Sequence, residues 1–203
     1  SPADGVAYES LSVAYTNLAI ATRDAGERAA LLNAALESAQ IAAWLAPDSR
    51  ARHTSRALLV ARNTFGVFLH EQRRLQEALA MITEEVVVAE ALVREDPQDS
   101  FIQETLGKAK CSVGQVRRAL QQAGWEEAVR GGILHLQRAT IMNRRDHWDE
   151  LAAWQQYLGA ELIADGRQQE GVAQYRLALA SYRLAVPTDK TQQAIAELTR
   201  LTP

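Results

Sequence analysis

The clearest fold pattern in the sequence lies in residues 158–178, LGAELIADGRQQEGVAQYRLA. It contains two helical runs separated by a turn, and small and large residues recur within it at fixed intervals. The positions that form this pattern are Leu158, Gly159, Leu162, Gly166, Gly171, Tyr175 and Ala178. A small residue lets two helices approach closely, and the large residues fill the space between them. We therefore predict a pair of packed helices, which must stack on neighbours because one pair cannot bury both of its apolar faces.

Helical periodicity continues through almost the whole chain, and strand patterns are nearly absent. One apolar stripe at helical spacing comprises Ala7, Leu11, Ala14, Leu18 and Ala21. Glycines, prolines and polar runs interrupt the periodicity at intervals of roughly one helix. The helices predicted from these breaks cover residues 5–24, 27–46, 49–70, 74–95, 99–123, 125–143, 147–164, 167–185 and 189–201. Capping boxes are predicted for two of them, at Ser100 with Gln103 and at Asp189 with Gln192.

The spacing around Gly159 resembles the tetratricopeptide repeat (TPR), in which Leu-Gly, a turn glycine and a small–aromatic–small set fall at these intervals. Weaker copies begin at Leu18, Phe65 and Leu106, and Ala128 stands near the small position of the third copy. The glycine spacings exceed the usual period of about 34 residues, so longer helices are expected. The resemblance implies an all-α fold, a right-handed array of about four antiparallel helical hairpins with a C-terminal capping helix. We expect residues 1–203 to form a single domain of this kind.

In repeats of this family the first helix of each pair lines a concave face that binds a peptide or a helix. The resemblance therefore implies a non-catalytic adaptor or scaffold that binds a protein partner. The residues expected to contact that partner are Asn17, Ile20, Arg23, Val60, Asn63, Val67, His70, Phe101, Glu104, Lys108 and Gln156. The remaining groove-facing positions are Val13, Thr16, Cys111, Ala153, Ala160 and Ile163. Apolar residues outnumber cations in this set, so we expect a partly apolar partner and no clamp for a terminal carboxylate.

Composition narrows the classes of function. Hydrophobic residues make up 47% of the chain. The net charge is −3, and this negative charge argues against general affinity for nucleic acid or for anionic membranes. The single cysteine excludes a disulfide framework. Phosphate-binding loops, nucleophile elbows and zinc-helix motifs are absent from the sequence, so we expect no enzymatic activity, no cofactor and no metal. His147 lies near Asp149 and Glu150, but an acidic first helical turn accounts for that grouping better than a metal site does.

Two other interpretations stay open. The chain could be a ligand-sensing domain with a closed helical pocket, or a scaffold that self-associates through the alanine-rich helix that contains Ala34, Ala35, Ala39, Ala42 and Ala43.

Gly131-Gly132 inside a helix predicts close packing by a neighbour, such as the helix that carries Trp154, or a kink. Long-helix variants resemble repeat arrays of bacterial signalling and regulatory proteins. We expect a cytoplasmic protein, with a periplasmic location left open, and a mature form or a piece of a longer chain.

Overall fold

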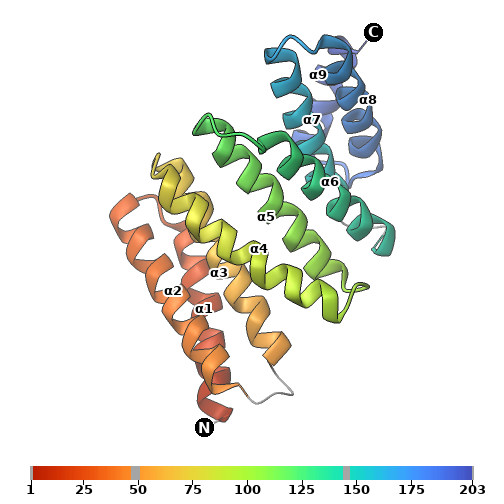
Figure 1. The fold of residues 1–203 in the computed structure, drawn as a ribbon. Helices are drawn as coiled ribbons and strands as arrows, with labels where there is room; N and C mark the ends of the chain where they lie inside the picture. The colour runs from red at the N-terminus through yellow and green to blue at the C-terminus, as the bar shows by residue number, and fades with distance from the viewer. Residues whose placement is uncertain (1, 47–50, 144–146, 203) are drawn as a thin grey trace. The chain divides into compact units, whose positions relative to one another are not determined.

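The computed structural model describes residues 2–46, 51–143 and 147–202, with backbone alone at 2–3 and 51–54. Over these ranges the fold is all-helical and contains no strand, as predicted (Figure 1). The chain divides into two compact units. The first comprises Ser1–Glu95 with Ala119–Gln121, and the second comprises Asp96–Arg118 with Gln122–Pro203.

The first unit contains four consecutive helices. These are α1 (Pro2–Ala21), α2 (Ala25–Leu45), α3 (Ala51–Glu71) and α4 (Leu75–Glu95). Each helix packs on the next, and α1 also packs on α3. The start of α2 is fixed by Asp24, whose carboxylate accepts a hydrogen bond of 2.8 Å from the backbone N–H of Glu27. The two helices α3 and α4 pack tightly at Gly66, where an added Cβ would lie 2.5 Å from Cγ1 of Ile82.

Alanines allow α2 and α3 to approach each other. Ala35, Ala39 and Ala61 are fully buried in one cluster. At the other end of the pair, the Arg28 guanidinium of α2 lies over the ring of Phe68, 5.1 Å from its centroid, and forms a 2.7 Å ion pair with Glu71. Of the alanines that the sequence offers for self-association, Ala35, Ala39 and Ala42 are buried within the unit, whereas Ala34 and Ala43 are half-buried.

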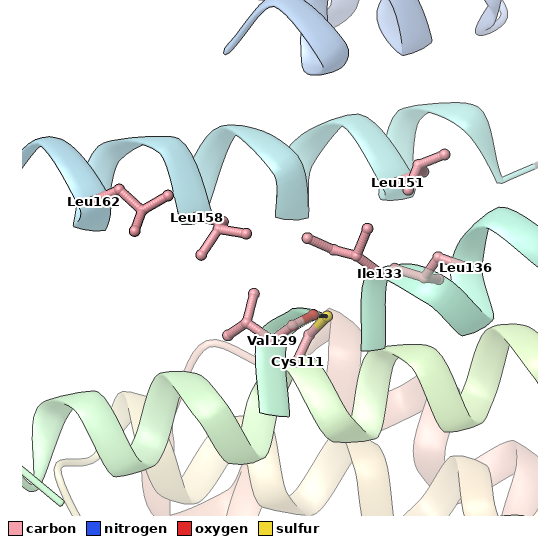
Figure 2. Close-up of a cluster of buried hydrophobic side chains, with 7 residues drawn as sticks. All are labelled: Cys111, Val129, Ile133, Leu136, Leu151, Leu158 and Leu162. Carbon is pink, nitrogen blue, oxygen red and sulfur yellow. Dashed lines mark hydrogen bonds between the residues drawn. The ribbon is translucent and has the colours of Figure 1, made fainter. Parts of the chain in front are cut away.

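The second unit contains the remaining helices of the described chain. They are α5 (Ser100–Ala119), α6 (Trp125–Met142), α7 (Trp148–Ala164), α8 (Gln168–Leu184) and α9 (Asp189–Leu201). Figure 2 shows one of its core clusters, in which Leu151, Leu158 and Leu162 of α7 face side chains of α6. The other members of that cluster are Cys111, Val129, Ile133 and Leu136. A second cluster, around Ala178 and Leu198, joins α8 to α9.

Glycines allow close helix approaches in the second unit. An added Cβ at Gly132 of α6 would lie 2.5 Å from the carbonyl oxygen of Gly107 on α5. An added Cβ at Gly159 of α7 would lie 2.9 Å from the carbonyl oxygen of Gly171 on α8. Close packing at Gly132 is therefore confirmed, but α5 makes the contact rather than the helix that carries Trp154. Gly132, not the half-buried Ala128, is the small residue at this crossing.

The predicted helix starts need two small corrections. Helix α5 is capped by Asp99, whose Oδ1 accepts from the N–H groups of Phe101 and Ile102, rather than by Ser100. The capping box of α9 is formed by Thr188 and Thr191, one residue before the predicted pair. Short side-chain oxygens cluster at both starts, so spacing alone could not distinguish which of them reaches the free N–H groups.

Candidate binding surfaces

A groove runs between α1 and α3 of the first unit. It encloses about 280 Å³ and is lined by Glu9, Ser12, Val13, Thr16, Asn17, Arg56, Ala57 and Val60. Asn17 and Val60 belong to the set expected to contact a partner, and Val13 and Thr16 were expected to face the groove. Val13 is 49% exposed and Val60 is 39% exposed, so the groove opens to solvent. Helices α1 and α3 thus bring these predicted residues together.

The exposed half of α1 carries no charge over most of its length. Between Glu9 and Arg23 the helix has no acidic or basic residue. Ile20, another residue expected to contact a partner, is 63% exposed, and Leu18 is 52% exposed. The apolar stripe noted in the sequence (Ala7, Leu11, Ala14, Leu18 and Ala21) is likewise on the exposed side. Exposed apolar residues that gather on one helix mark an interaction surface better than the same residues scattered singly.

The other expected residues of α3 divide between surface and interior. Val67 is 38% exposed. The side-chain amide of Asn63 donates a 3.3 Å hydrogen bond to Oε2 of Glu85, a carboxylate on α4 that is fully buried. Asn63 therefore supports the α3–α4 contact. At His70, burial and then the charge of Arg73 lower the pKa of the imidazole, and the charge of Glu71 only partly opposes this shift.

In the second unit, Glu104 and Lys108 form an ion-pair cluster between α5 and α7. The Lys108 ammonium lies 2.7 Å from Oε1 of Glu104 and 3.8 Å from Oε2 of Glu150, and His147 lies 3.1 Å from Oε2 of Glu104. Burial alone would lower the pKa of Lys108, but the charges of Glu150 and Glu104 outweigh it and raise that pKa. Trp154 donates a 2.9 Å hydrogen bond to Glu150. Both predicted residues are thus engaged inside the unit.

The remaining predicted positions differ in how far their side chains are exposed. Gln156 accepts a 3.3 Å hydrogen bond from the hydroxyl of Tyr182, and Phe101 is half-buried in the first turn of α5. Cys111, expected to face the groove, is fully buried. Its thiol donates to the Val129 carbonyl at 3.5 Å, and burial raises its pKa. Arg23, Ala153 and Ala160 are exposed, whereas Ile163 is half-buried.

Sequence reasoning missed a second groove, formed by α6, α7 and α8. It also encloses about 280 Å³ and is lined by Arg130, Ile133, Leu134, Gln137, Gln155, Leu158, Gln174 and Leu177. Gln155 is only 2% exposed. The sequence holds one signal for this site, because Gln155 falls on the buried stripe of α7 at helical spacing from Leu151 and Leu158. A polar side chain on a core stripe needs a hydrogen-bond partner, and that requirement points to a specific function of the position.

An ion-pair network lies beside this second groove. Arg167 forms a 2.6 Å ion pair with Glu126, and Arg130 forms a 2.8 Å ion pair with the same carboxylate. The hydrogen bond from Arg167 is the main cause that lowers the pKa of Glu126; burial opposes the shift and Arg130 reinforces it. Arg167 also pairs with Glu170 at 2.6 Å. These ion pairs link α6 directly to the start of α8, and both helices also pack on α7.

Two negative findings apply to the part of the chain that the structure describes. No group of three or more His, Cys, Asp or Glu side chains converges there in a way that could hold a metal ion. Within the same residues, no helix combines the length and the apolarity needed to cross a bilayer. No protein-family model matches the chain, and no curated protein sequence is significantly similar to it.

Proposed function

We propose that the chain is a non-catalytic, TPR-like interaction module that binds an apolar peptide or helix in the α1–α3 groove. The observation that carries this proposal is the groove itself, in which Val13 and Asn17 of α1 face Val60 of α3. Valines offer apolar contact, and the Asn17 amide offers both a donor and an acceptor to a peptide backbone. Glu9 and Arg56 also line the groove, so its formal charge balances and an uncharged partner face fits it best.

The TPR-like part of the proposal draws support from the helix contacts. In each of three consecutive pairs, a glycine on the first helix is in close contact with the second: Gly66 on α3, Gly107 on α5 and Gly159 on α7. We interpret these pairs as antiparallel hairpins of one right-handed array with α9 as its cap. An adaptor role in bacterial signalling or regulation is part of the same proposal.

A photo-crosslinking experiment tests the proposal. A photoreactive amino acid at Asn17, which is exposed, is activated in lysate of the source cells, and the captured protein is identified by mass spectrometry. The double variant Val13→Glu/Val60→Glu places charge in the groove at positions that are already partly exposed. We expect it to abolish capture. Val87→Glu is the matched control, because Val87 is 62% exposed on α4 outside the groove, and it should preserve capture. Equal capture by all three chains would refute the α1–α3 site.

Self-association through α1 is a second candidate, which the exposed stripe of that helix favours. The stripe from Ala7 to Ala21 alternates steps of four and three residues, as coiled-coil contact positions do. Leu11 is 43% exposed and Leu18 is 52% exposed at its centre. Sedimentation equilibrium should then show a dimer that Leu11→Glu/Leu18→Glu converts to monomer. A wild-type chain that stays monomeric at every concentration would remove this candidate.

A further inference from the structure

We propose that the groove formed by α6, α7 and α8 binds an extended peptide segment in which a leucine-like side chain stands next to a carboxylate. This site lies on other helices than the α1–α3 groove and does not rest on the function proposed above. It involves the second helix of two consecutive pairs, α6 and α8, with α7 between them. Its failure would leave the α1–α3 proposal intact, and the converse also holds.

The first argument is a buried amide with an unused donor. Oε1 of Gln155 accepts a 2.8 Å hydrogen bond from the hydroxyl of Ser181 on α8. The amide nitrogen Nε2 has no hydrogen-bond partner among the residues that the structure describes. Gln155 is 2% exposed and lines the groove, so the small accessible part of the residue faces that space. Nε2 is not among the fully buried atoms that lack a partner, so it is accessible from the groove, where a peptide carbonyl could accept its hydrogen bond.

The second argument is the shape and apolarity of the groove. Ile133 and Leu158 form buried parts of its lining, while Leu134 and Leu177 remain 57% and 48% exposed at its sides. Its volume of about 280 Å³ lies at the lower end of the usual range of small-molecule pockets, about 300–1,000 Å³. A single branched apolar side chain with its adjoining backbone suits this space better than a cofactor does. The four apolar residues of the lining therefore select a leucine-like side chain.

The third argument is the length and the hydrogen-bonding character of the lining. From Arg130 to Gln137 the α6 side of the groove spans about 10 Å, at 1.5 Å per helical residue. Three residues of an extended chain cover about the same distance, at about 3.3 Å each. Gln137 and Gln174 also line the groove, and each amide can donate to and accept from a peptide backbone. A short extended segment can use all three glutamines, whereas a helix already satisfies its own backbone groups.

The fourth argument is charge complementarity. Arg130 is the only charged residue among those that line the groove. Its Nε pairs with Glu126 at 2.8 Å and its Nη2 lies 3.8 Å from Glu170, while its side chain stays 41% exposed. Its Nη1 makes no hydrogen bond with any described residue. That nitrogen can donate to a peptide carboxylate, which places the acidic residue of the ligand at the Arg130 end.

The experiment titrates the full chain with the blocked peptide acetyl-Ser-Leu-Glu-Ser-amide and follows the side-chain amide signals by NMR. We expect saturable shifts that include the Gln155 amide, with millimolar affinity. Gln155→Met keeps the length of the side chain and removes the donor, and it should weaken binding about fivefold. Leu134→Ala should weaken binding about threefold. Replacing the peptide's glutamate by glutamine should weaken it about threefold, through the lost ion pair with Arg130.

Two controls separate binding from folding. Ile141→Ala removes an apolar side chain that is 70% exposed on α6 outside the groove, and it should leave the affinity unchanged. Ser181→Ala removes the same Ser181–Gln155 hydrogen bond that Gln155→Met removes but keeps the amide, so binding should persist. The absence of saturable shifts would overturn the proposal. So would an affinity that Gln155→Met and Leu134→Ala leave unchanged, or one that Ile141→Ala or Ser181→Ala reduces as much as they do.

Discussion

Alanine at the adjacent glycines Gly131 and Gly132 should change the stability of the second unit in opposite directions. A Cβ at Gly131 would have its nearest contact at 3.9 Å, with Cδ of Lys110, so the new methyl group fits without displacement. A Cβ at Gly132 would lie 2.5 Å from the Gly107 carbonyl oxygen and 2.8 Å from the Cys111 amide nitrogen. Both of those atoms are backbone, and they can move only if α5 and α6 separate.

The magnitudes follow from two competing terms. Replacing glycine by alanine inside a helix gains about 1 kcal/mol, because alanine loses less backbone entropy on folding. At Gly131 nothing opposes that gain, so Gly131→Ala should raise the free energy of unfolding by up to about 1 kcal/mol. Overpacking costs about 1–3 kcal/mol, and clashes with rigid backbone belong at the upper end. Gly132→Ala should therefore lower the free energy of unfolding by about 2 kcal/mol in net terms.

Urea unfolding followed by tryptophan fluorescence measures both changes. Trp125, Trp148 and Trp154 pack against the core cluster of the second unit, whereas Trp44 in the first unit is 83% exposed and should change little. Destabilisation appears as a lower midpoint at constant slope. The new Cβ at position 132 would also clash with the Cys111 thiol. Adding Cys111→Ala to Gly132→Ala removes that thiol but leaves the clash with the Gly107 carbonyl, so it should restore stability only in part. Shifts of the same sign at both glycines, or a Gly132→Ala chain as stable as wild type, would refute the backbone-clash argument.

Two further perturbations test a helix cap and a titrating side chain. Thr188→Ala removes the hydroxyl that accepts the Thr191 N–H at 3.1 Å, and it should destabilise α9 by about 1 kcal/mol, measured as faster amide hydrogen exchange in that helix. His70 has a pKa below its ordinary value of 6.5, so the unfolded chain takes up this proton at a higher pH than the folded chain does. Stability should therefore fall as the pH drops from 6.5 towards the lowered pKa of the folded state, and His70→Gln should reduce that slope in urea midpoints measured across the range.

Each of these two predictions has an outcome that contradicts it. Unchanged exchange rates in α9 after Thr188→Ala would mean that the capping box does not determine where the helix begins. Thr199→Ala is the matched control for the cap, because it removes a comparable hydroxyl of the same helix, which donates to the Ile195 carbonyl at 2.7 Å and caps nothing. A His70→Gln chain with the same pH slope as wild type would mean that another group carries the titration.

The grooves could be predicted only in part from the sequence. Asn17 and Val60 line the same groove because α1 packs on α3. Asn63 and Gln156 stand at the same type of position, yet their amides bond to Glu85 and Tyr182 inside their units. Helical spacing gives the direction of a side chain around its own axis, but the nearest partner on another helix decides whether that side chain is available to a ligand.

The sequence by itself determined where the helices lie. Glycines, prolines and polar runs act on the local backbone, so the predicted ranges match α1 to α9 to within about two to four residues. The tertiary structure alone decided which face of each helix is buried. In α1, apolar residues occur around most of the circumference, and Leu11 and Leu18 are exposed while Ser12 and Thr16 are buried. Periodicity cannot select a face on such a helix, because burial depends on which neighbouring helix approaches and how closely its small residues allow it to pack.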